Sequence, residues 1–157
     1  MKVILLAIGK IDDKIFSDAQ EMYAKRINHY VSFTVETIPD VKNTKNLSQD
    51  EQKNAEGALI LKKLQPSDYV VLLDDKGKQY SSTDFAYFIE KKSYAAAKRM
   101  IFVVGGPYGF SNAVYARADE KLSLSKMTFT HQMVRVIFVE QLYRAMTILN
   151  NEPYHHA

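Results

Sequence analysis

The chain has 157 residues, of which 46% are hydrophobic and 25% are charged, and its formal net charge is +3. These values predict one globular domain over residues 1–157 and exclude a chain that is disordered throughout. The absence of cysteine excludes disulfides, thiolate metal sites and cysteine nucleophiles, and the modest positive charge permits an RNA partner without indicating one.

The first half of the chain alternates predicted strands and helices. Val3 to Ile8 is a short apolar run, typical of a buried strand and too short for a signal peptide or a membrane span. We therefore expect a cytoplasmic protein with no membrane contact. A helix is predicted from Asp12 or Asp13 to about Asn28, and a second strand from Phe33 to Ile38.

Residues 40–47 are polar and are predicted to form a mobile loop. Ser48 and Glu51 fit a capping box that opens a helix running to about Leu64. A third buried strand is expected from Asp68 to Leu73, with residues 74–78 as its exit turn.

The second half repeats the alternation. Ser82 or Thr83 is expected to cap a helix that runs to about Lys92, and a fourth strand covers residues 100–104. Ser111 is expected to cap a short helix. A fifth strand over residues 121–125 and a final helix over residues 132–149 complete the chain. The pattern predicts an α/β fold with one mostly parallel sheet flanked by helices.

Two loops follow predicted strands and precede helices, and these are the places where an α/β protein binds small ligands. The first is Gly105-Gly106-Pro107-Tyr108-Gly109, and the second follows Leu124. The chain has neither a dinucleotide fingerprint nor a P-loop, which disfavours a Rossmann-type oxidoreductase and a P-loop ATPase. Paired glycines let a ligand approach the backbone, although an ordinary tight turn explains them equally well.

Arg135 stands out in the final helix because it shares a face with apolar residues such as Phe138, Val139 and Leu142. A charge on such a face is costly unless it is paired. It is expected to meet a neighbouring subunit, a ligand anion or an RNA phosphate, or else to extend along its own stem to the surface. Glu140 and Arg144 have the spacing of an ordinary helix pair.

The histidines give a weaker signal. His131 lies at the start of the final helix, and His155 lies in the terminal tail. Each is compatible with a structural hydrogen bond or with a place near the crevice. No spacing of ligands indicates a metal site.

Several segments together resemble one family, the RlmH type of ribosomal RNA methyltransferase in the SPOUT (α/β-knot) superfamily. The segments are Ala7-Ile8-Gly9-Lys10, Glu56-Gly57, Gly105 to Gly109, Leu122 to Phe129, His131 to Val136, and Tyr154-His155. The resemblance covers essentially the whole chain.

The resemblance implies an enzyme that methylates N3 of a pseudouridine, position 1915 of the 23S rRNA in the large ribosomal subunit, with S-adenosylmethionine as methyl donor. It also implies a deep C-terminal trefoil knot and a homodimer in which each acceptor site is partly held by the other subunit. The implied cofactor residues are Leu73, Gly105, Gly106, Leu124, Ser125, Lys126, Met127, Thr128 and Phe129. Phe129 and Thr130 stand where related sequences often have a proline before the histidine.

For the chemistry, His155 or His131 is the expected base and Arg135 the expected electrostatic stabiliser, with no metal. The alternatives are a knotted methyltransferase with another RNA target such as a tRNA, and a non-catalytic α/β module that binds a nucleotide or a protein.

Overall fold

The computed structural model describes residues 1–95 and 97–156. One parallel sheet holds all the strands found there, in the order β2-β1-β4-β3-β5. The strands are β1 (Lys2–Ile8), β2 (Ser32–Ile38), β3 (Tyr69–Gln79), β4 (Arg99–Val104) and β5 (Glu120–Ser123). The helices are α1 (Lys14–Ile27), α2 (Gln49–Lys63), α3 (Ser82–Ser93), α4 (Asn112–Arg117) and α5 (His131–Leu149). The predicted α/β class with a parallel sheet is confirmed.

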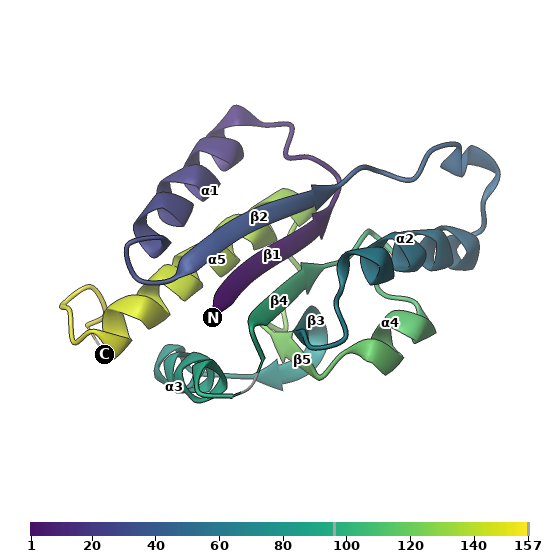
Figure 1. Cartoon of the computed structure of the whole chain (residues 1–157). Coiled ribbons are helices and arrows are strands. Elements are labelled where there is room, and N and C mark those ends of the chain that lie inside the picture. Colours follow the sequence, from purple (N-terminus) through teal and green to yellow (C-terminus); the bar gives the residue numbers. More distant parts are fainter. Residues whose placement is uncertain (96, 157) are drawn as a thin grey trace.

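The sheet is covered on both faces, with α1, α3 and α5 on one side and α2 and α4 on the other (Figure 1). Alternate residues of each central strand enter opposite cores, as the two-residue period of a strand requires. In β1, Leu5 packs in the core beneath α5, and its neighbour Leu6 packs in the core beneath α2. This double coverage explains why the strands read as continuous apolar runs.

The chain crosses the sheet between β5 and α5. Strand β5 pairs with β3 at one edge, but the first turn of α5 contacts the end of β1, because Arg135 bonds to the carbonyls of Ile8 and Gly9. The Gln132 side chain also accepts from the backbone N–H groups of Asp12 and Asp13, just before α1. Residues 124–130 therefore pass over the carboxyl ends of the strands. The trefoil knot itself stays a prediction.

Strand β3 differs from its prediction. Residues 74–78 were expected to be an exit turn, but β3 continues to Gln79. Leu73 and Lys78 both face Leu122 of β5, so the residues between them form an outward bulge rather than the end of the strand. In β5 the prediction ran two residues too far, because the strand ends at Ser123.

The helix caps mostly follow the sequence. Ser48 and Glu51 form the predicted capping box, and the Ser111 hydroxyl accepts from the N–H of Val114. The cap of α3 is Ser81, one residue before the expected Ser82, and it accepts from Asp84. In the polar segment 40–47, which was predicted to be a loop, Thr44–Asn46 forms a 3-10 turn.

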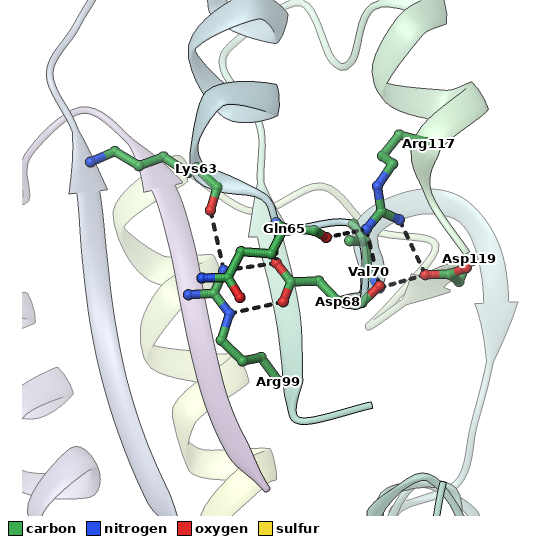
Figure 2. Close-up of polar contacts among 7 residues, drawn as sticks. All are labelled: Lys63, Gln65, Asp68, Val70, Arg99, Arg117 and Asp119. Atoms are coloured by element: carbon green, nitrogen blue, oxygen red, sulfur yellow. Dashed lines mark hydrogen bonds and ion pairs between the residues drawn. The ribbon is translucent and has the colours of Figure 1, made fainter. Parts of the chain in front are cut away.

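Polar side chains join the amino ends of β3 and β4 to the end of α2 and to the segment that follows α4 (Figure 2). The Asp68 carboxylate, whose side chain is fully buried, accepts from Arg99 Nε at 2.8 Å and Nη2 at 2.7 Å. Arg117 donates to the backbone carbonyls of Gln65 and Asp68. Burial works against ionisation of Asp68, but the hydrogen bonds from Arg99 and the backbone outweigh it and lower the pKa of the carboxyl.

Helices α2 and α4 pack closely at Gly57. A Cβ atom on Gly57 would lie 2.3 Å from Oγ of Ser111, so only glycine fits where α2 meets the cap of α4. Within the described residues, no helix combines the length and the apolar character needed to cross a membrane.

Candidate active site

A pocket of about 840 Å³ opens at the carboxyl ends of the strands, where the two expected ligand loops meet. Its walls follow β1, β3, β4 and β5, and they are completed by side chains from α2, α4 and α5. Crevices at this end of a parallel sheet are the usual ligand sites of α/β proteins, and the volume suits a molecule of cofactor size.

One half of the pocket, here called the β5 wing, is apolar and rich in backbone polar groups. Its residues are Leu73, Leu122, Leu124, Ser125, Met127, Thr128 and Phe129. The loop holds its own shape, because Ser123 Oγ donates to the carbonyl of Ser125 and Ser125 Oγ accepts from the N–H of Met127. Thr130 then caps α5 by accepting from Met133. The wing therefore offers apolar side chains on a loop that is held by its own hydrogen bonds.

The rim beside the β5 wing carries Asp74, Asp75, Lys76 and Tyr115. The Tyr115 hydroxyl donates to the Asp74 carboxylate. Burial opposes ionisation of Asp74, but the bonds from Tyr115 and from the N–H of Lys76 outweigh it and lower its pKa. Burial and the neighbouring Asp74 raise the pKa of Tyr115 to about 12. Asp74 therefore stays an anion and a hydrogen-bond acceptor at neutral pH.

The other half, here called the β1 wing, is polar. Its residues are Gly9, Lys10, Asp12, Asp40, Gln52 and Glu56. Glu56 is 3% exposed, and its Oε1 has no hydrogen-bond partner among the described residues. Burial raises the pKa of Glu56. A side-chain hydrogen bond with Gln52 lowers the pKa and the nearby charge of Asp40 raises it, and the net shift is upward.

Gly106 lies between the two wings. Both carboxylate oxygens of Glu56 are 2.4 Å from the position that a Cβ atom on Gly106 would take. Any side chain at position 106 would collide with this carboxylate. The paired glycines therefore do more than form a tight turn, because the backbone of the loop after β4 rests directly against a buried acid.

Arg135 is 1% exposed and does not line the pocket. It donates to the carbonyls of Ile8 at 2.7 Å, Gly9 at 2.8 Å and His131 at 3.1 Å. Burial lowers its pKa, and Asp40 opposes this shift. The alternative that Arg135 extends along its own stem to the surface is wrong, because its guanidinium is enclosed between α5 and the end of β1. Its contacts indicate a positioning residue.

The chain has clear relatives along its whole length. A family model described as predicted SPOUT methyltransferase matches residues 1–155. The chain belongs to this family.

The curated relatives of this SPOUT chain include "Ribosomal RNA large subunit methyltransferase H" of Parabacteroides distasonis, which is 62% identical over 99% of both chains. The protein of the same name from Christiangramia forsetii is 58% identical over 99% of both chains. Among solved structures, the SpoU methyltransferase AviRb of Streptomyces viridochromogenes in complex with AdoMet has a TM-score of 0.45 and 9% identity. That match covers 96% of this chain and 61% of AviRb.

The SPOUT chain brings most of its expected cofactor residues into one pocket. The lining includes Leu73, Gly105, Gly106, Leu124, Ser125, Met127, Thr128 and Phe129, whereas Lys126 lies outside it. His131 also lines the pocket and is exposed at the start of α5. Their roles in binding or catalysis stay predictions.

His155 lies far from this pocket within one SPOUT chain. Helix α5 has 19 residues, so it separates its two ends by about 28 Å at 1.5 Å per residue. The pocket is lined by His131 at the start of this helix, and the C-terminus lies near the other end of α5 (Figure 1). His155 Nδ1 is 3.1 Å from Arg144 Nη1, and Tyr154 donates to Glu140 at 2.9 Å. Arg144 and Glu140 form the predicted ion pair. His155 and His131 of one chain therefore cannot act on the same atom.

The sequence reasoning gave no role to Glu56, which appeared there only as part of the resemblance. One signal was present. Glu56 precedes the buried Ile60 by one helical turn, so it faces the core rather than solvent. In the described parts of the chain, no three acidic or histidine side chains are grouped to hold a metal ion.

Proposed function

We propose that this protein methylates the large-subunit ribosomal RNA, and that the acceptor is N3 of pseudouridine 1915 in the 23S rRNA, as the resemblance implies. The observation that carries the proposal is the match of the whole chain to the SPOUT family and to relatives named as ribosomal RNA large subunit methyltransferases. A ribosomal target places the reaction in the cytoplasm.

The methyl donor in this proposal is S-adenosylmethionine, whose sulfonium supplies an already activated methyl group. The residues of the pocket fit such a molecule. Leu73, Leu124, Met127 and Phe129 offer an apolar slot for adenine, and the loop after β5 offers backbone polar groups. Asp74 is held as an anion and suits hydroxyl groups of a ribose.

What remains for the protein is to align donor and acceptor, exclude water and remove one proton. In this proposal the β5 wing holds the donor and the β1 wing receives the base. Arg135 fixes the start of α5 against the end of β1, and so sets the distance between His131 and Gly9 across the pocket. In this proposal, recognition rests on the shape and backbone contacts of an assembled ribosomal surface.

We also propose that the enzyme works as a homodimer, in which His155 serves the pocket of the partner subunit. The support is geometric, because His155 contacts Arg144 in the C-terminal half of α5, whereas the pocket of its own chain is lined by His131 at the start of that helix. Mixing chains that carry His155→Ala with chains that carry an inactivating change in the pocket is expected to restore activity in mixed dimers. Equal inactivity of the mixture would contradict the shared site.

The substrate is tested with ribosomes from a strain that lacks the modification. These are incubated with the enzyme and labelled S-adenosylmethionine, and the modified nucleotide is mapped by mass spectrometry. Label at N3 of the pseudouridine supports the proposal, and label only in tRNA refutes the ribosomal assignment in favour of another RNA target.

A further inference from the structure

We propose that Glu56 is the proton acceptor of the reaction and takes the N3 proton of the target base as the methyl group is transferred. This inference rests on the proposed function, because the acceptor nitrogen of a uracil-type ring carries a proton that must leave. Neither the family match nor the relatives' names assign a role to Glu56.

The first support is the unmet hydrogen-bonding capacity of one carboxylate oxygen, Oε1. Glu56 is 3% exposed, it lines the pocket, and Oε1 has no partner within the described residues. A buried acceptor without a donor costs free energy, so such groups in native proteins usually have a function or a missing partner. In this proposal, the N3–H group of the target base supplies the partner that Oε1 lacks.

The second support is where the carboxylate lies. It rests against Gly106, at the boundary between the two wings, so a base in the β1 wing and a methyl group presented from the β5 wing would meet beside it. The other charged groups of the β1 wing are Lys10, Asp12 and Asp40. Lys10 and Asp12 lie at exposed positions, as does His131, whereas Glu56 is held away from water.

The third support is basicity. A carboxyl group with its ordinary pKa is a weak base for a ring nitrogen, and the pKa of Glu56 is raised by its burial and by Asp40. General bases work best when their pKa approaches the working pH, and burial is the usual way for a protein to bring a glutamate there.

The step balances without any further reactant. The N3–H bond breaks and its proton goes to a carboxylate oxygen of Glu56, while the electron pair stays on N3. N3 attacks the methyl carbon, and the carbon–sulfur bond breaks with its electron pair moving to sulfur. The products are N3-methylpseudouridine, S-adenosylhomocysteine and a protonated Glu56, which loses its proton to solvent after release.

The test compares Glu56→Gln with the wild type in single-turnover methylation of ribosomes that lack the modification. Glutamine keeps the size of the side chain and an acceptor oxygen but cannot take the proton. The expected loss in rate is at least ~100-fold, the lower end of the general-base range, with an unchanged Kd for S-adenosylhomocysteine in calorimetry. Asp50→Asn on the same helix, where Asp50 is exposed, is the matched control and is expected to keep full activity.

A second variant separates catalysis from structure. Glu56→Ala opens space beside Gly106, and added formate is expected to restore part of its rate, since a free carboxylate replaces the missing base. A loss below about fivefold for Glu56→Gln, a parallel rise in the Kd for S-adenosylhomocysteine, or absence of formate rescue would each overturn the proposal. If the wild type itself fails to label pseudouridine N3, the proposed function fails, and that result is distinct from failure of the variants.

Discussion

Replacing Arg135 with methionine tests whether this arginine holds α5 to β1. Methionine fills similar space but cannot donate, so the buried carbonyls of Ile8 and Gly9 lose their bonds from Arg135. Each such loss costs roughly 1–3 kcal/mol. The change also removes the cost of burying a guanidinium for which no carboxylate partner is found among residues 1–95 and 97–156.

The net expectation is a loss of about 3 kcal/mol in the free energy of unfolding. With a urea dependence of about 2 kcal/mol per molar, the unfolding midpoint should fall by about 1.5 M. The assay is urea denaturation followed by circular dichroism, at one fixed protein concentration because association alters apparent stability. The unfolding midpoint of Arg135→Lys should lie between those of the wild type and Arg135→Met, since an ammonium group cannot match the paired donors of a guanidinium.

Arg26→Met is the matched control, because Arg26 is exposed and lies over the rings of Tyr23 and Tyr143, and its side chain makes no hydrogen bond within residues 1–95 and 97–156. Its effect should stay within about 0.5 kcal/mol. A midpoint for Arg135→Met within about 0.3 M of the wild type would refute the reasoning. It would mean that the carbonyls of Ile8 and Gly9 find other donors or water once the guanidinium is gone.

Three further changes probe other parts of the fold. Asp68→Asn should destabilise the protein by about 2 kcal/mol at pH 7, because Arg99 loses its charged partner. Because the folded-state pKa of Asp68 is lowered, its carboxylate contributes fully to stability above the ordinary pKa of 3.8, and this contribution is lost as the pH falls below that value. The wild type should therefore lose stability faster than Asp68→Asn as the pH is lowered in this range. Parallel acid-unfolding curves for the two proteins would contradict this. Gly57→Ala should lower the melting temperature through its clash with Oγ of Ser111, and adding Ser111→Ala should recover part of the loss; additive effects would argue against the clash. Gly106→Ala should lower both stability and methyl transfer because it displaces Glu56, and a fully active variant would show that the carboxylate can move without consequence.

The sequence by itself determined the elements of this protein and their class. Continuous apolar runs such as residues 3–8 mark strands covered on both faces, and the capping residues Ser48 and Ser111 mark helix starts through local hydrogen bonds. Both signals depend on neighbours within a few residues, so they can be read without knowing the fold. The same local rules failed at residues 74–78, where pairing with β5 keeps a charged, glycine-containing bulge within β3.

Only the tertiary structure decided which groups the buried polar side chains contact. The sequence marks Arg135 as a charge on an apolar helix face and gives Glu56 no role of its own, and it cannot state the partners of either residue. The carbonyls bound by Arg135 at Ile8 and Gly9 lie more than 120 positions away along the chain, and Glu56 rests on a glycine from another loop. Contacts between such distant segments follow from strand order and from the crossing between β5 and α5, which no local pattern encodes. For that reason the structure, and not the motif, separates an arginine bound to three backbone carbonyls from a buried glutamate whose Oε1 has no hydrogen-bond partner among the described residues.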